Sequence, residues 1–340
     1  MAPPSAAEHA PAYDVFNGDA DGICALHQLR LAQPRAARLI TGVKRDIALL
    51  QQVPCEASID VTVLDVSLDA NADALRRILA AGGRVTYFDH HSARQAFTHP
   101  ALQLMWSDAC DVCTSLLVDR HVGGRFRHWA IVAAFGDNLA PAAQALAAEA
   151  GLSADQTCAL DELGCLINYN AYGECIDDLH IAPDALYRAI RPFADPFAFM
   201  AESPLFRRLA LGYRDDMAHT AALMPVLQWA AGAIYVLPDA PWARRVSGVF
   251  ANQLAATRRA SSFAVLTACP SGAYVVSVRS GAPDACAADH LCTRFPTGGG
   301  RRAAAGINVL PAAELDAFIA AFSDHFAVQG TPRHSQEDSR

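Results

Sequence analysis

Side chains that bind metal ions or transfer protons gather at the ends of three predicted strands. Asp19 and Asp21 lie in an N-G-D-A-D-G segment directly after the apolar run 13–16. Asp65 ends a later apolar run, and a D-H-H tripeptide at 89–91 ends another. Carboxylate and imidazole groups together suit Mn²⁺ or Mg²⁺, and such ions activate water for phosphoryl transfer. These residues therefore indicate a metal-dependent hydrolytic site.

Each carboxylate also has an ordinary structural interpretation. Asp21 is a suitable N-cap for the helix that follows, Asp19 suits a turn, and Asp65 suits a cap between a strand and a helix. The combination is different, because several carboxylates in one crevice repel one another unless cations neutralise them. A divalent ion is the economical solution. Asp137, in a G-D pair after an apolar helical stretch, would complete the ligand set.

The elements that position these residues alternate between strand and helix. Short runs rich in Val, Ile, Leu and aromatic residues predict strands at 13–16, 38–42, 61–66 and 84–88. The apolar spacing of amphipathic helices is found at 22–33 and 71–81. This alternation predicts right-handed crossovers and a parallel sheet, whose strands end at one shared edge. That edge would bring the acidic and histidine residues together.

The rest of the chain predicts a long helical connection and then a second α/β region. Helices are expected at 111–122, 127–136, 140–150, 155–170, 183–191 and 205–231. A second pattern follows, with strand 233–237, helix 243–257, strands 262–268 and 273–279, helix 284–293, a glycine turn, strand 304–309 and helix 311–327. We therefore expect two domains with a boundary between 200 and 230. The ends, 1–11 and 329–340, are expected to be disordered.

Composition and charge limit the classes of protein to consider. A chain of 340 residues, 52% of them hydrophobic, is long enough for two cores. Residues 1–199 carry a net charge of −10 and residues 200–340 one of +2, without the basic stripe that holds long duplex DNA. Small anionic substrates or short single strands fit better. No apolar run approaches the roughly 20 residues of a membrane helix, so we expect a cytoplasmic protein with no membrane contact.

Ten cysteines are scattered without regular spacing. A chain of this size with a full core does not need disulfide bonds, so we expect reduced thiols. Cys110 and Cys113 form a C-x-x-C pair, but no second pair stands at zinc-site spacing. We therefore interpret this pair as structural packing.

The order of the motifs resembles that of the DHH phosphoesterase superfamily. The shared features are D-x-D-G after the first strand, a lone Asp, D-H-H, a later G-D, and a distant triple glycine followed by A-A-G, over residues 12–310. The superfamily includes RecJ-type single-strand exonucleases, oligoribonucleases, cyclic-dinucleotide phosphodiesterases and exopolyphosphatases. The resemblance implies a parallel-sheet DHH domain at 12–200, a helical linker at 201–230 and a smaller α/β DHH-associated domain at 231–328. The active site would lie in the cleft between the two domains.

The resemblance also implies a role for each residue of the acidic cluster. Five residues would be ligands of a centre with two Mn²⁺ ions, or Mg²⁺ in their place: Asp19, Asp21, Asp65, His90 and Asp137. Asp65 would bridge the two ions. Of the two residues expected to be catalytic, Asp89 would orient a ligand and His91 would face the substrate phosphate.

The second domain is expected to supply contacts to the substrate. Ser277 and Arg279 belong to an S-x-R-S segment that resembles the substrate-contacting segment of the DHH-associated domain. An arginine on an apolar strand has few structural explanations, because an unpaired buried guanidinium is costly. Gly298, Gly299 and Gly300 would expose backbone N–H groups, as anion-binding turns do, although a flexible loop is the alternative.

Two positions depart from the family pattern. Val15 stands where many members have a further histidine ligand, so one ion would bind weakly. Arg301 follows the triple glycine where the usual residue is histidine. Arginine cannot act as an acid at neutral pH, so we expect Arg301 and Arg279 to hold a terminal or non-scissile phosphate.

The leading hypothesis is a metal-dependent phosphodiesterase that acts on short oligonucleotides, dinucleotides or related small nucleotides through water activated by two metal ions. A RecJ-like single-strand exonuclease is the close alternative. A phosphoanhydride hydrolase that cleaves polyphosphate or pyrophosphate is a third. A non-catalytic nucleotide-binding sensor, marked by Val15 and Arg301, comes from a different class. Helices between 111 and 230 could form a homodimer.

Overall fold

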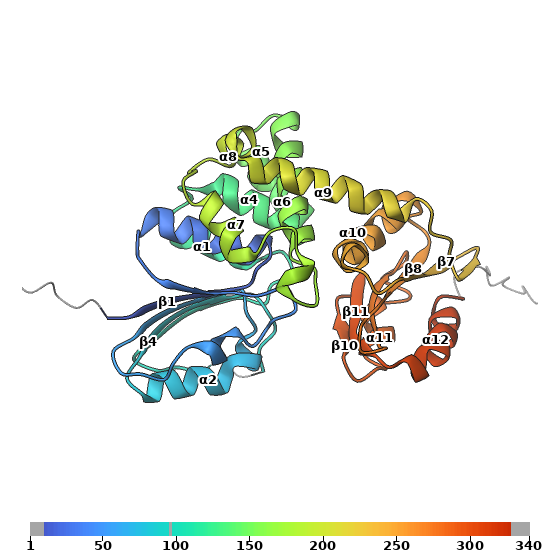
Figure 1. Ribbon diagram of the computed structural model, residues 1–340, viewed down its shortest axis with the longest axis horizontal. Coiled ribbons are helices and arrows are strands. Elements are labelled where there is room, and N and C mark those ends of the chain that lie inside the picture. Colours follow the sequence, from blue (N-terminus) through green and yellow to red (C-terminus); the bar gives the residue numbers. More distant parts are fainter. Residues whose placement is uncertain (1–9, 95–96, 328–340) are drawn as a thin grey trace, which may run out of the picture. The chain divides into compact units, whose positions relative to one another are not determined.

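The computed structural model of the chain describes residues 10–94 and 97–327 (Figure 1). Of the two ends for which we expect disorder, 1–11 and 329–340, all but residues 10 and 11 lie outside the described residues. The chain divides into two compact units, one up to Tyr213 and the other from Arg214 onward. In the described ranges, no helix has the length and apolar character needed to cross a membrane.

A parallel five-stranded sheet forms the centre of the first unit. Its strands are β1 (Ala12–Phe16), β2 (Arg38–Ile40), β3 (Asp60–Leu64), β4 (Arg84–Asp89) and β5 (Leu102–Trp106). They lie in the order β2-β1-β3-β4-β5, and each neighbouring pair is parallel. The order changes direction at β1 and β3, and such a switch point is where parallel sheets bind ligands beyond the strand ends.

Helices cover both faces of this sheet. On one face lie α1 (Ala20–Ala32), α3 (Thr114–His121), α4 (Arg127–Gly136) and α6 (Ala154–Asn170), and on the other lies α2 (Leu68–Ala80) (Figure 1). Each face of the sheet packs in its own hydrophobic core. Successive side chains of a strand point to opposite faces, so alternate residues belong to different cores. The core under α1 takes Phe16, Leu64 and Phe88, and the core over α2 takes Val15, Val63 and Tyr87.

Two glycines bring α4 close to its neighbours. A Cβ at Gly164 of α6 would lie 2.2 Å from the carbonyl oxygen of Val132 in α4. A Cβ at Gly136, the last residue of α4, would lie 2.5 Å from the Cβ of Ala20 at the start of α1. Larger side chains cannot be accommodated at either contact, so α4 ends directly beside the beginning of α1.

The first unit continues through α5 (Ala140–Glu149), α7 (Pro183–Ile190) and α8 (Pro196–Glu202), and α9 (Pro204–Thr220) leads into the second unit. The second unit contains a mixed sheet in the order β10-β11-β9-β8-β7-β6. Its strands are β6 (Leu227–Trp229), β7 (Gly232–Leu237), β8 (Ser262–Ala268), β9 (Tyr274–Arg279), β10 (Gly298–Gly300) and β11 (Ala304–Leu310). Its helices are α10 (Pro241–Thr257), α11 (Ala288–Cys292) and α12 (Leu315–Ala327).

The predicted α/β class, with a parallel sheet followed by a second α/β region, is confirmed. Several elements differ from expectation. The helix expected at 205–231 ends at Thr220, and β6 follows it, because Pro225 disfavours helix in the residue before it. The helix expected at 284–293 is confined to Ala288–Cys292, and the expected glycine turn is the short strand β10. Strand β5 and helix α8 were not predicted.

The ten cysteines are free thiols, as expected. Cys113 packs in the core of the first unit, whereas Cys110 is exposed. Packing therefore explains Cys113, the second member of the C-x-x-C pair, and not Cys110, the first.

Candidate metal centre at the strand ends of the first sheet

Asp19 and Asp21 lie in the turn between β1 and α1, and both are buried. Asp19 is the N-cap of α1, where one carboxylate oxygen accepts the backbone N–H groups of Asp21 and Gly22. The carboxylate of Asp21 instead accepts the N–H groups of Thr114 and Ser115, both at 2.7 Å. Asp21 thus stabilises the first turn of α3, where backbone N–H groups favour a negative charge. These hydrogen bonds fix both carboxylates at the switch point.

Asp65 follows β3 and adopts a left-handed backbone conformation, with φ at 59°. Such a conformation is uncommon outside glycine, although aspartate tolerates it better than most residues. Its side chain is buried, and Oδ1 accepts a hydrogen bond of 3.3 Å from the hydroxyl of Thr114. Strained backbone at a strand end is a recurrent feature of functional sites, and here it aims a carboxylate into the cluster.

His90 presents one ring nitrogen to three carboxylates. Its Nδ1 lies 3.1 Å from the carbonyl oxygen of Val112, which can only accept a hydrogen bond, so Nδ1 carries the proton in the neutral ring. Its Nε2 lies 3.4 Å from Asp65 and 3.8 Å from both Asp21 and Asp137. A backbone carbonyl that fixes the imidazole in this way is typical of histidine metal ligands.

Asp89 holds the D-H-H segment in place. The carboxylate is fully buried and accepts four hydrogen bonds. Oδ1 receives the backbone N–H groups of His90 and His91 and the Nδ1 of His91 at 2.7 Å, while Oδ2 receives the N–H of Leu68. Because both of its oxygens accept hydrogen bonds, Asp89 orients the two histidines.

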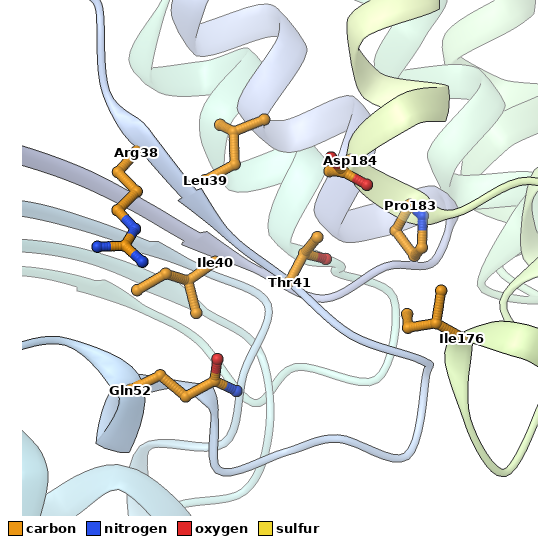
Figure 2. A pocket seen from close by; sticks show the side chains of 8 residues that line it. All are labelled: Arg38, Leu39, Ile40, Thr41, Gln52, Ile176, Pro183 and Asp184. Carbon is orange, nitrogen blue, oxygen red and sulfur yellow. The ribbon is translucent and has the colours of Figure 1, made fainter.

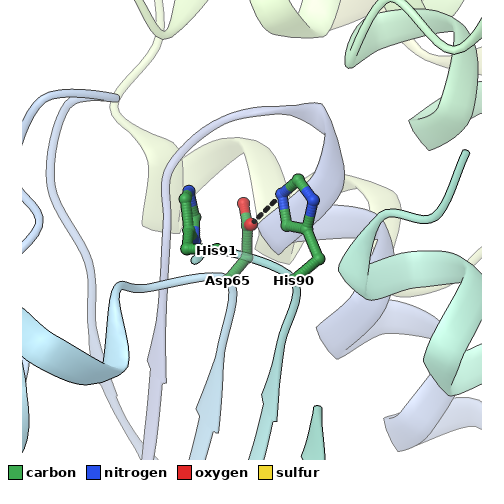
Figure 3. A group of neighbouring side chains, drawn as sticks. All are labelled: Asp65, His90 and His91. Carbon is green, nitrogen blue, oxygen red and sulfur yellow. Dashed lines mark ion pairs between the residues drawn. The ribbon is translucent and has the colours of Figure 1, made fainter. Parts of the chain in front are cut away.

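Asp65 lies between the rings of His90 and His91 (Figure 3). One donor atom of each of these three residues lies within 4.8 Å of the others. His91 is 39% exposed at its side chain, in contrast to His90 at 7%. Burial disfavours protonation of His91, but its hydrogen bond to Asp89 raises its pKa. His91 is therefore the imidazole of this group that a solute can reach.

Asp137 comes directly after α4, and the glycine contacts at the end of that helix bring it to the cluster. Its two oxygens face different side chains. Oδ2 lies 3.8 Å from Nε2 of His90, and Oδ1 lies 3.9 Å from the ammonium of Lys44. The structure thus brings together all five residues expected as ligands.

Lys44 was not identified from the sequence. It lies in the loop after β2, and its ammonium contacts Asp19 at 2.5 Å and the side-chain oxygen of Asn168 at 2.9 Å. Lys44 is the single lysine among the 27 basic residues of the chain, and that feature of the composition could have drawn attention to it. Thr114 and Asn168 lie on helices without a motif, so nothing in the sequence singles them out.

The electrostatics of the cluster reflect crowded negative charge. Burial raises the pKa of Asp65 well above its usual range, and the neighbouring carboxylates of Asp21 and Asp19 raise it further. Burial also raises the pKa of Asp137, against the opposing charge of Lys44. Burial would raise the pKa of Asp19 too, but Lys44 and the N–H of Gly22 hold it at about 2.

The donor set fits a divalent cation. Three carboxylates converge on one imidazole nitrogen, and the imidazole is oriented by a backbone carbonyl. Oxygen-rich sets with one or two imidazoles suit Mn²⁺ or Mg²⁺. Such an ion would offset the charge that otherwise disfavours ionisation of Asp65 and Asp137.

The residues expected to contact substrate lie on the second unit. Ser277 and Arg279 lie on β9, and the guanidinium of Arg279 donates 2.6 Å to the side-chain oxygen of Asn252 on α10. That contact is a structural explanation for an arginine on this strand. Arg301 is exposed beside β10, in a tight turn to β11 that its backbone N–H closes on Ala304.

The triple glycine forms an edge strand paired with β11 instead of an anion-binding turn. The N–H of Gly298 bonds to the carbonyl of Phe295, and a Cβ there would lie 1.8 Å from the carbonyl oxygen of Cys292. Close packing on α11 therefore explains the first glycine of the three.

A separate pocket of about 240 Å³ opens between β2 and α7 (Figure 2). Its lining residues are Arg38, Leu39, Ile40, Thr41, Gln52, Ile176, Pro183 and Asp184. None of them belongs to the acidic cluster. We assign no function to this pocket.

No family model matches the sequence. No curated protein matches it. Solved structures do match it in fold. The chain is similar to the DHH domain of a member of the s1p family of ribosomal proteins, with a TM-score of 0.64 at 14% identity over 95% of this chain and 87% of that one.

Two further structures with a similar fold are of enzymes. Exonuclease RecJ bound to manganese matches with a TM-score of 0.60 at 19% identity, over 98% of this chain and 93% of that one. The pGpG-specific phosphodiesterase PggH from Vibrio cholerae matches with a TM-score of 0.53 at 14% identity, over 94% and 100% of the two chains. The chain therefore has the fold of DHH-domain proteins, as the order of its motifs predicts.

Proposed function

We propose that this protein is a divalent-metal-dependent phosphoesterase of the DHH type that hydrolyses phosphodiester bonds of short oligonucleotides, dinucleotides or related small nucleotides. The observation that carries the proposal is the convergence of Asp21, Asp65 and Asp137 on Nε2 of His90, within 3.8 Å. Without a bound cation, these buried carboxylates would destabilise the folded protein, because burying uncompensated negative charge is unfavourable.

A bound divalent ion would supply the Lewis acidity that activates water and neutralises charge developing on phosphate. The protein's own residues would do the rest. Asp89 would fix the orientations of His90 and His91. Nε2 of His91 would then donate a hydrogen bond or a proton to a phosphate oxygen. The raised pKa of His91 supports this role, because the ring then keeps its proton nearer neutral pH.

The second unit would supply the contacts that select the substrate. Arg301 is exposed and always charged, and with Arg279 and Ser277 it would hold a terminal or non-scissile phosphate. Manganese as the preferred ion, homodimer formation and a cytoplasmic location stay predictions.

A RecJ-like single-strand exonuclease is the second candidate, favoured by the manganese-bound RecJ structure that this chain resembles. Net charge favours the smaller substrate, because −8 over the whole chain opposes a long polyanion. Similarity to a pGpG-specific phosphodiesterase agrees with that preference.

A panel of substrates tests the proposal. The protein with Mn²⁺ would be incubated with pApA, cyclic di-AMP, single-stranded DNA, 3′-phosphoadenosine 5′-phosphate and polyphosphate, beside an Asp65→Asn variant. We expect Mn²⁺-dependent cleavage of the dinucleotide that the variant lacks. Progressive cleavage of single-stranded DNA alone would favour the exonuclease, and release of phosphate from polyphosphate alone would favour the phosphoanhydride hydrolase. No cleavage of any substrate would favour a sensor and contradict the proposal.

A further inference from the structure

The single lysine of the chain is built into the acidic cluster. The other 26 basic residues are arginines. The backbone of Lys44 is held on both sides, since its N–H donates 2.9 Å to the carbonyl of Ala171 and its own carbonyl accepts 3.1 Å from the side chain of Asn17. The loop that carries Lys44 is therefore tied both to the turn before Asp19 and to the end of α6.

The ammonium of Lys44 makes contacts that a metal ion could make. It contacts Asp19 at 2.5 Å and Asn168 at 2.9 Å, and it lies 3.9 Å from Asp137. The oxygens of Asp19 and Asn168 lie within hydrogen-bond distance of this compact cation, and Asp137 adds a longer ion-pair contact. The ring of Tyr172, 5.6 Å away, adds a cation–π contact.

The cluster thus has two cation positions that share Asp137. Oδ2 of Asp137 faces the imidazole of His90, together with Asp21 and Asp65. Oδ1 of Asp137 faces Lys44, together with Asp19. The first position has a metal-binding nitrogen and no fixed cation of its own among the described residues. The second position already contains the positive charge of Lys44.

Val15 removes another potential donor. It lies two residues before Asn17 and is fully buried in the apolar core that faces α2. It offers no atom that binds a metal. An ion at the second position would therefore have Asp19 and Asp137 as its carboxylate ligands. The ammonium of Lys44 already contacts both carboxylates, and it would repel an ion bound between them.

We propose that the ammonium of Lys44 takes the place of the second metal ion, so that this centre holds a single divalent ion at His90, Asp21, Asp65 and Asp137. This inference rests on the proposed function. It differs from the expected count of two ions, because a side chain would supply the second positive charge. A lysine suits the position better than an arginine, since its charge is compact.

Counting bound Mn²⁺ tests the inference without reference to activity. The full-length protein would be equilibrated with Mn²⁺, freed of excess ion, and measured by elemental analysis and by electron paramagnetic resonance. We expect one ion per chain and the spectrum of an isolated Mn²⁺. Lys44→Gln should bind two ions with an exchange-coupled spectrum, and Lys44→Arg, which keeps the charge, should bind one.

The outcomes separate this inference from the proposed function. Two coupled ions in the wild-type protein would overturn the inference and leave the proposed function standing. A single ion in a folded Lys44→Gln variant would also overturn it. If the wild-type protein bound no Mn²⁺, both the inference and the proposed function would be contradicted.

A second measurement needs no variant. Because Lys44 is the single lysine, reductive methylation can modify one side chain and the amino terminus, and mass spectrometry of the peptides reports each. We expect Lys44 to be modified no faster with Mn²⁺ present than without it. A severalfold faster reaction with Mn²⁺ would show that the ion displaces the ammonium, and would contradict the inference.

Discussion

His90 and Asp65 meet across the ends of neighbouring parallel strands, with Nε2 of the imidazole 3.4 Å from Oδ1 of the carboxylate. They are 25 positions apart in sequence, and the register of β3 and β4, which pairs Leu64 with Phe88, brings the two strand ends together. Because Nδ1 of His90 is bound to the carbonyl of Val112, Nε2 is directed at the carboxylates as a donor to a cation.

Replacing His90 should weaken metal binding more than any surface histidine does. His90→Ala removes the single nitrogen ligand of the proposed site, and we expect the affinity for Mn²⁺ to fall by at least about tenfold. Isothermal titration calorimetry measures this directly. His290→Ala, at an exposed position of the second unit, is the matched control and should leave the affinity unchanged. Equal affinities in the two variants would remove His90 from the ligand set.

Replacing Asp89 should change the orientation of His90 and His91 and the stability of the protein more than the number of metal ions it binds. Asp89→Asn replaces one accepting oxygen by an N–H₂ group, which opposes at least one of the four donors that Asp89 now receives. We expect a loss of about 1–3 kcal/mol in the free energy of unfolding and a fall in kcat larger than the change in KM. Urea denaturation and steady-state kinetics measure the two effects. Asp73→Asn, on the surface of α2, is the control, and a similar loss there would argue against a specific role.

His27 should make stability depend on pH between about 6.5 and 4. Burial lowers the pKa of His27 to about 4 in the folded protein, from an ordinary value of 6.5. As pH falls through this window, the unfolded chain binds a proton that the folded protein excludes, so the free energy of unfolding decreases as pH falls. The full effect is about 3 kcal/mol, at 1.36 kcal/mol per pKa unit.

The His27→Gln variant isolates this effect from those of the carboxylates. Glutamine keeps an N–H donor for the carbonyl of Phe193, which Nε2 of His27 now contacts at 2.8 Å. Denaturation at pH 7 and pH 4.5 should give a smaller pH dependence for the variant than for the wild-type protein. Identical pH dependence in both would show that His27 is not the group responsible.

Gly164 should link helix packing to the metal site. A Cβ at this position would lie 2.2 Å from the carbonyl oxygen of Val132, and backbone cannot move aside without shifting α4. Gly164→Ala should therefore reduce the free energy of unfolding by about 1–3 kcal/mol and weaken Mn²⁺ binding, because Asp137 follows α4 directly. Thermal denaturation and calorimetry test both parts. A variant that loses stability but binds Mn²⁺ normally would show that Asp137 is positioned independently of this contact.

The sequence predicts the parallel sheet because its central strands are apolar and the intervening helices are amphipathic. Strand β5 was missed because it lies at the edge of the sheet and carries partly exposed residues such as Gln103. Asp19, Asp65 and His90 could be predicted to converge because parallel strands end at one edge. Lys44 could not, because it lies in an irregular loop whose path is set by distant contacts such as the bond to Ala171. The edge strand at 298–300 was missed because glycine runs favour turns, while pairing with β11 is a tertiary effect.

The most direct test of the metal centre is anomalous diffraction at the manganese edge from crystals of the protein grown with Mn²⁺. We predict a strong anomalous peak in contact with Nε2 of His90 and the carboxylates of Asp21, Asp65 and Asp137. A Mn²⁺ peak elsewhere, with these four side chains bound to no ion, would contradict the account.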